Sequence, residues 1–190
     1  MSVREQIIES ALELCARRGI TATSVQDIAD AAHCSKANVL YHFSHKEDLI
    51  NEALQPSLVA TSDLIARAES RGLDTDTDRI AFVAELVDLL FGHRLAHHIV
   101  ITHPYLVDSV PALARAQEVM GYLAELVATK THGDVDRVRL GIAIAGVSYA
   151  LVSQSTLGLD TADDHLRQEL LTEALVSMVI TQQSAIGQGA

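Results

Sequence analysis

One segment constrains the fold of this chain more than any other: Thr23 to Lys46, with the sequence TSVQDIADAAHCSKANVLYHFSHK. Its apolar residues recur every three or four positions, the period of a helix, with one interruption at His33. Thr23 or Ser24 before the first half, and Ser35 before the second, are residue types that cap helix N-termini. The segment therefore predicts two short helices joined by a tight turn, the arrangement of a helix-turn-helix.

The turn requires an unusual backbone conformation at His33. A tight turn between two helices usually needs one residue with a positive φ, which glycine adopts most readily. Histidine tolerates this conformation better than a β-branched residue does, so we expect a positive φ at His33, at some cost in strain.

Capping signals predict the flanking helices. Ser2 with Glu5 is a capping-box pair, and Gly19 can end the first helix in a left-handed conformation. Ser44 with Glu47 is a second pair, ahead of a long fourth helix. The predicted inward faces consist of Ile7, Ile8, Ala11, Leu12 and Cys15, of Val25, Ile28, Ala29 and Ala32, and of Val39 and Phe43.

The middle of the chain predicts further helices separated by breaks. Pro56 should kink or interrupt the fourth helix. An acidic linker, DTDTD at 74–78, precedes an apolar helix over about 80–95. Pro104 and Pro111 mark breaks, and Ser109 is the expected cap of a helix that runs to about residue 131.

The last two predicted helices are strongly apolar. The stretch from Leu140 to Leu159 holds no charged residue and is long enough to span a bilayer, but its polar second half and its small residues favour a buried interface helix. Thr161 opens the final helix, whose apolar stripe consists of Leu166, Leu170, Leu171, Ala174, Leu175 and Met178. Two such helices favour a homodimer with a four-helix interface.

The segment from about Arg4 to Ile50 resembles the DNA-binding domain of the tetracycline-repressor (TetR) family of bacterial transcription regulators. It departs from that family at His33, where glycine is usual, and at Leu40, where a phosphate-contacting tyrosine is frequent; Tyr41 stands next in the chain. The matching residues are Ala11, Leu12, Gly19, Thr23, Ser24, Val25, Asp27, Ile28, Ala29, Ala32, Ser35, Lys36, Phe43, Lys46, Glu47, Asp48 and Leu49.

This resemblance implies an all-α fold of two parts. The expected parts are a three-helix helix-turn-helix DNA-binding domain at 1–48 and a helical effector-binding and dimerisation domain at 49–185. It also implies a ligand-responsive regulator, by default a repressor, in which the last two helices form the homodimer and the middle helices enclose a small-molecule pocket. A two-fold dimer would read two half-sites of a palindromic operator in double-stranded DNA.

The second helix of the motif would enter the major groove. Lys36, Ala37 and Asn38 lie at its start, where Lys can reach guanine acceptors, Asn can bond adenine, and the Ala methyl can meet a thymine methyl. Ser24, Tyr41, His42 and Lys46 would face phosphates, and Thr23 and Ser35, at the helix starts, complete the predicted DNA-contacting set. The alternatives are that Lys36 and Lys46 are solvated surface charges and that Tyr41 belongs to the core.

The charge of the chain is unusual for a DNA-binding protein. The formal net charge is −11, and acidic residues outnumber basic ones even within residues 1–50. Between Lys36 and Lys46, however, no acidic residue occurs, and His42 and His45 lie there too. We therefore expect weak non-specific binding, reliance on site-specific contacts, and affinity that falls as the salt concentration rises.

The middle helices offer a mixed lining for an effector: Phe82, Phe91, His93, His97, Tyr105, Met120, Tyr122 and Tyr149. His93 and His97 are one helical turn apart and could jointly hold zinc, and His98 and His103 add to the cluster. No Cys or carboxylate lies within helical reach of the pair, however. Ordinary polar histidines, hydrogen bonds to an organic effector, and a metal all stay open. No metal or other cofactor is predicted.

Two rival functions also stay open. A helical metal enzyme built on His93 and His97 would leave the first fifty residues unexplained, and the sequence lacks phosphate loops and nucleophile elbows, so we expect no enzyme. A non-sensing dimeric DNA-binding protein would leave the remaining helices with dimerisation alone. Glu5 and Glu9 argue against a signal peptide, and Cys15 and Cys34 form no disulfide framework, so we expect a cytoplasmic protein with reduced cysteines and no membrane segment.

Overall fold

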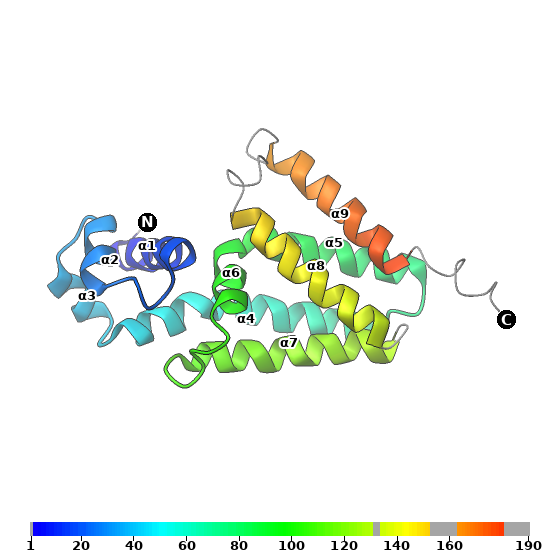
Figure 1. The fold of residues 1–190 in the computed structure, drawn as a ribbon, viewed down its shortest axis with the longest axis horizontal. Coiled ribbons are helices and arrows are strands. Elements are labelled where there is room, and N and C mark those ends of the chain that lie inside the picture. The colour runs from blue at the N-terminus through cyan, green and yellow to red at the C-terminus, as the bar shows by residue number, and fades with distance from the viewer. Residues whose placement is uncertain (1, 131–133, 153–162, 181–190) are drawn as a thin grey trace. The chain divides into compact units, whose positions relative to one another are not determined.

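The computed structural model describes residues 2–130, 134–152 and 163–180, and within these residues the chain is helical without a strand, as predicted (Figure 1). The helices are α1 (Val3–Arg18), α2 (Val25–Ala31), α3 (Lys36–His42), α4 (Lys46–Arg71), α5 (Asp76–Gly92), α6 (Arg94–Thr102), α7 (Pro111–Lys130), α8 (Asp134–Val152) and α9 (Asp164–Ile180).

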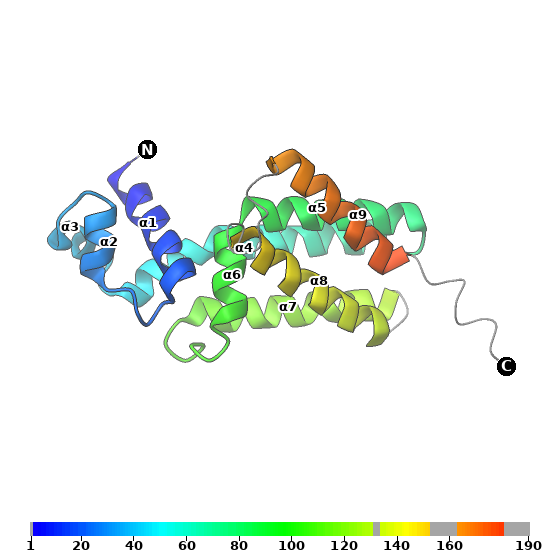
Figure 2. The same cartoon turned by 45° about the horizontal axis from the view of Figure 1, so that its top comes forward.

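Two compact units make up the chain. Unit 1 comprises Met1–Val59 and Leu95–Val119, and unit 2 comprises Ala60–Arg94 and Met120–Ala190. In unit 1, α1, α2 and α3 pack against one another; in unit 2, α5, α8 and α9 do so, as both ribbon views show (Figures 1 and 2). The boundary expected at residue 48 stays a prediction.

The predicted starts of the first three helices are confirmed. Ser2 with Glu5 and Ser24 with Asp27 form capping boxes, and the Ser35 hydroxyl accepts a hydrogen bond from the Asn38 N–H at 3.1 Å. Each cap satisfies a backbone N–H that a helix leaves without an internal partner. Local sequence therefore determines where these helices begin.

Positive φ values occur at the predicted turn residues. His33 has φ 52°, and it is the one non-glycine residue with a positive φ in the described part of the chain. Gly19 ends α1 with φ 89° and ψ 154°, so its φ is positive as expected although its ψ is extended rather than left-handed helical. Its N–H donates to the Cys15 carbonyl at 2.9 Å, which closes the helix.

The fourth helix differs from its prediction in two ways. It begins at Lys46, where the Asp48 carboxylate accepts from the His45 N–H at 3.0 Å, so the predicted Ser44–Glu47 cap is wrong by one residue. It also continues through Pro56 to Arg71, so an interruption at Pro56 is wrong, while the alternative, a kink, stays a prediction. A proline within a long helix removes one backbone hydrogen bond, and the surrounding turns keep the helix intact here.

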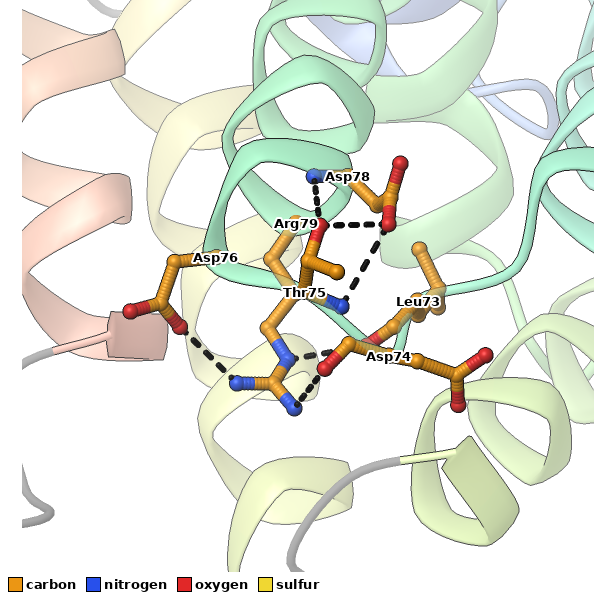
Figure 3. Close-up of polar contacts among 6 residues, drawn as sticks. All are labelled: Leu73, Asp74, Thr75, Asp76, Asp78 and Arg79. Carbon is orange, nitrogen blue, oxygen red and sulfur yellow. Dashed lines mark hydrogen bonds and ion pairs between the residues drawn. The ribbon is translucent and has the colours of Figure 1, made fainter.

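The acidic tract at 74–78 is not a linker but the start of α5. The Thr75 hydroxyl accepts from the Asp78 N–H at 3.2 Å, and the Asp78 carboxylate accepts from the Thr75 backbone N–H at 3.3 Å, which makes a third capping box (Figure 3). Arg79 donates to the carbonyls of Leu73 and Asp74 and pairs with Asp76 at 3.0 Å. The helix therefore starts four residues earlier than predicted and ends at Gly92.

The helices that follow also depart from the predicted bounds. A separate helix, α6, lies between the end of α5 and the break predicted at Pro104, where no helix was assigned from the sequence. The Ser109 hydroxyl donates to the Leu106 carbonyl instead of capping α7, which begins at Pro111. The amide oxygen of Asn51, from α4, accepts from the Ala112 N–H at 2.7 Å and so supplies the cap from another helix.

The last two helices are described only in part. The Asp163 carboxylate accepts from the Leu166 N–H at 2.8 Å at the start of α9, while the predicted cap Thr161 and the end of the 140–159 stretch lie outside the described residues. Among the residues that the structure describes, no helix combines the length and apolar character needed to cross a bilayer.

Candidate nucleic-acid interface

The first three helices bury one common core. Ile7, Ala11 and Cys15 of α1 and Ile28 of α2 have no solvent exposure, and Val39 of α3 is 1% exposed. Burial raises the pKa of the Cys15 thiol, so this side chain is a neutral core group. Both cysteines are free. With its inner face fixed in this way, α3 can present only its opposite face to a partner.

That outward face of α3 carries side chains of mixed chemistry. Lys36, Ala37, Leu40 and Tyr41 are exposed, with 43% exposure for Leu40 and 83% for Tyr41. These positions have the spacing i, i+1, i+4 and i+5 and therefore share one side of the helix, which is exposed, whereas Val39 is buried. Tyr41 is thus a surface residue, and its alternative assignment to the core is wrong.

Asn38 and His42 flank this face and are half-buried. Val39 and Phe43 are buried, as predicted. In the turn before α3, Ser35 is exposed, yet its hydroxyl oxygen already accepts from the Asn38 N–H. A contact from Ser35 to another molecule would have to use its hydroxyl proton or its backbone.

Ser24 and Thr23 have different positions at the start of α2. Ser24 is exposed, and its hydroxyl donates to the Asp27 carboxylate at 2.5 Å. This bond, with that from the Ser24 N–H, lowers the pKa of Asp27. Thr23 is only 1% exposed and donates its hydroxyl proton to the Gly19 carbonyl at 2.8 Å. We assign the Thr23 side chain a structural role, because it does not reach the surface.

Lys46 connects α4 to the loop between α1 and α2. Its ammonium group donates to the carbonyls of Ile20 and Thr23, each at 2.8 Å. The side chain is half-buried, so it is more than the solvated surface charge that was one alternative. An ammonium has three protons, and two are used here.

Two residues that sequence reasoning missed support this unit. The Arg4 guanidinium lies 5.1 Å from the centre of the Phe43 ring and pairs with Glu52 of α4. His103, which follows α6, is 7% exposed, and its Nε2 accepts from the Ile20 N–H at 3.3 Å. Both contacts join residues far apart in sequence, so no local pattern could have indicated them.

The helix-turn-helix matches a known family. Residues 7–53 match the model of the bacterial regulatory proteins of the tetR family. The chain is 36% identical over 78 residues to the probable acrEF/envCD operon repressor of Escherichia coli K12. The aligned region covers 40% of this chain and 34% of that relative. It is 29% identical over 144 residues to the HTH-type transcriptional repressor KstR2 of Rhodococcus jostii RHA1, covering 76% of this chain and 65% of that relative.

Residues 7–53 therefore form a tetR-family helix-turn-helix domain.

Solved structures from this family share the fold. A TetR-family regulator from Bordetella parapertussis has a TM-score of 0.64 at 20% identity, with 95% of each chain covered. Mycobacterium smegmatis AmtR has a TM-score of 0.71 at 19% identity, covering 94% of this chain and 86% of that one. The curated relatives are longer: the chain spans about a third of the length of the E. coli repressor.

The residues predicted to line an effector pocket fall in both units. His97, which is 6% exposed, and Tyr105, which is 70% exposed, belong to unit 1. Burial lowers the pKa of His93, which favours its neutral form. The members in unit 2 range from 3% exposure for Phe82 to 50% for Tyr149 and 56% for Tyr122; they are Phe82, Phe91, His93, Met120, Tyr122 and Tyr149.

One of these eight residues lines a hollow within unit 2. Tyr122 shares a hollow of about 330 Å³ with Glu69, Glu125, Leu126 and Thr129. Its hydroxyl donates to the Glu69 carboxylate at 2.8 Å, and this bond raises the pKa of the phenol. As for the alternative metal site, no group of three His, Cys, Asp or Glu in the described part of the chain could hold a metal ion together.

Proposed function

We propose that this chain is a TetR-family transcription regulator, by default a repressor, that binds a palindromic operator as a homodimer and is released by a small-molecule effector. The observation that carries the proposal is the outward face of α3, which is exposed while the opposite side of the same short helix is held in a buried core. A helix presented in this way fits the major groove of duplex DNA.

The contacts with DNA divide into two classes. Lys36, Ala37 and Asn38 would read base edges, because they lie in the first turn of α3. Ser24, Tyr41, His42 and the remaining proton of Lys46 would meet phosphates, which fix the register of the helix without reading sequence. The buried Thr23 side chain has no part in this set.

Dimerisation through α8 and α9 is supported by apolar side chains that are exposed on both helices in the described part of the chain. On α8, Val138, Ile142 and Tyr149 are exposed by 50–61%, and on α9 Leu166 and Leu170 are exposed by 44% and 53%. A Cβ atom added at Gly141 or Gly146 of α8 would meet nothing within 4 Å. A second copy could therefore approach α8 closely and cover these side chains.

A small-molecule effector would act by its preference for one of two states of the protein. A ligand can weaken operator binding only by as much as it prefers the state that does not bind DNA. Thermal stabilisation of the purified protein by a candidate compound would support a sensor, whereas a regulator that works without an effector would give no such response to any compound.

The first experiment is a selection of bound duplexes from a random pool at moderate salt. We expect a palindrome to be enriched, and we expect Asn38→Ala and Lys36→Ala to lose it or relax single positions within it. Ala66→Ser, an exposed change on α4 outside α3, is the matched control and should leave the palindrome unchanged. A folded dimer that enriches no duplex, with or without candidate effectors, would contradict the proposal.

A further inference from the structure

Leu40 is an exposed aliphatic side chain in the middle of the helix proposed to enter the groove. It is 43% exposed, whereas Val39 beside it is 1% exposed and Phe43 is 4% exposed. Ala37, three residues earlier, is also exposed and lies on the same side of α3. The two side chains form an apolar strip along the outward face, with Lys36 at one end and Tyr41 at the other.

An aliphatic group has only one kind of partner in the major groove. Leu40 has no side-chain hydrogen-bond donor or acceptor, so it can contact neither a phosphate oxygen nor a polar base edge by a hydrogen bond. The apolar group that the groove presents is the 5-methyl group of thymine. The local charge also suits DNA, because no acidic residue occurs between Lys36 and Lys46.

The spacing of the strip matches the spacing of base pairs. Ala37 and Leu40 are separated by about 4.5 Å along the helix axis, since each residue advances about 1.5 Å. Successive base pairs are about 3.4 Å apart. Ala37 and Leu40 can therefore each contact one thymine, and these two thymines are either neighbours or separated by one base pair.

We infer that Leu40 is a specificity-determining residue that reads the methyl group of a thymine in each half-site, close to the thymine read by Ala37. The inference rests on the proposed function and adds to it the chemistry of one operator position. It assigns sequence readout to a residue outside the first turn of α3.

Substitution of single thymines by deoxyuridine tests the inference, because it removes the methyl group and leaves the base pair intact. On the duplex selected with the unchanged protein, we expect uracil at the position facing Leu40 to weaken binding about fourfold per methyl group, the effect of losing one buried CH₂ or CH₃. Leu40→Ala should bind the thymine and uracil duplexes equally well.

Val59→Ala is the matched control, because Val59 is 58% exposed on α4 and lies outside the helix-turn-helix. It should keep the discrimination of the unchanged protein. If no uracil weakens binding, or if Leu40→Ala still discriminates at the same position, this inference is wrong while the operator-binding function stands. If no duplex is enriched in the first place, the proposed function and this inference fail together.

Discussion

The Nε2 atom of His103 accepts a hydrogen bond from the backbone N–H of Ile20 at 3.3 Å, in the interior of unit 1. The Nδ1 atom of the same ring lies 3.1 Å from the Ile99 carbonyl, which can only accept, so Nδ1 carries the proton and Nε2 the lone pair. Gly19 leaves room for the ring, since a Cβ atom there would lie 3.1 Å from Nε2. A neutral histidine thus joins the end of α6 to the loop after α1.

Replacement of His103 should destabilise the protein. His103→Phe fills a similar space but leaves the buried Ile20 N–H without an acceptor, and we expect the free energy of unfolding to fall by about 1–3 kcal/mol. Urea denaturation followed by circular dichroism measures this change. His45→Phe, at an exposed position, is the control and should have almost no effect. Equal losses for the two variants would show that the hydrogen bond contributes nothing.

Asn51 should stabilise the first turn of α7 from a distance. Its amide oxygen takes the place of an N-cap side chain for the Ala112 N–H, so Asn51→Leu should cost about 0.5–2 kcal/mol, the range for lost caps. Asn51→Asp keeps the acceptor and places a negative charge at a helix N-terminus, which is favourable. We expect thermal melting to rank Asn51→Asp above Asn51→Leu, and the reverse order would contradict the assignment.

Lys46 should contribute to folding before any DNA is present. Lys46→Met keeps the aliphatic stem but removes the bonds to the Ile20 and Thr23 carbonyls, and hydrogen bonds from charged groups are worth about 1.5–3 kcal/mol. Lys36→Met removes an exposed charge and should leave stability unchanged. If both variants unfold at the same urea concentration, Lys46 is a surface charge after all.

The stability that Asp27 provides should depend on pH. Hydrogen bonds from the Ser24 side chain and backbone lower the pKa of Asp27 below its ordinary value of 3.8. The carboxylate therefore contributes its full stabilisation above about pH 3.8, and the contribution is lost as the pH falls through the lower folded-state pKa. The difference in Tm between the unchanged protein and Asp27→Asn should shrink across that range. A difference that stays constant down to about pH 2 would exclude this linkage.

A charge on the exposed face of α8 should separate a dimer into monomers. Ile142 is 60% exposed, so Ile142→Glu should leave the single chain folded, yet a buried unpaired carboxylate at a dimer interface is costly. Light scattering after size exclusion should give twice the chain mass for the unchanged protein and the chain mass for the variant. Val59→Glu, a similarly exposed position on α4, should remain dimeric. A dimeric Ile142→Glu would place the interface elsewhere.

The N-terminal helices were predictable because their determinants are local. Ser2, Ser24 and Ser35 each act on an N–H three residues ahead, and His33 carries the turn by its own backbone conformation. The tract at 74–78 was misread for the opposite reason. Its aspartates looked like a solvated linker, although Thr75 and Asp78 have the same spacing as Ser2 and Glu5.

The contacts that hold the site in place were not predictable. The pairs Ile20–His103, Asn51–Ala112 and Arg4–Phe43 join residues that only the folded chain brings together. The exposure of Leu40 was not predictable from the sequence either. The sequence marks it as apolar, but only its exposure beside a buried Val39 distinguishes a surface residue from a core residue.

The peptide groups around Ile20 have a further consequence. Its N–H is bonded to His103, and its carbonyl is bonded to the Lys46 ammonium, although the residue lies in a loop between helices. Amide hydrogens in loops commonly exchange with solvent quickly because nothing protects them. The Ile20 amide should instead exchange as slowly as one inside a helix, which makes a single backbone proton a reporter of whether His103 and the N-terminal helices remain attached to each other.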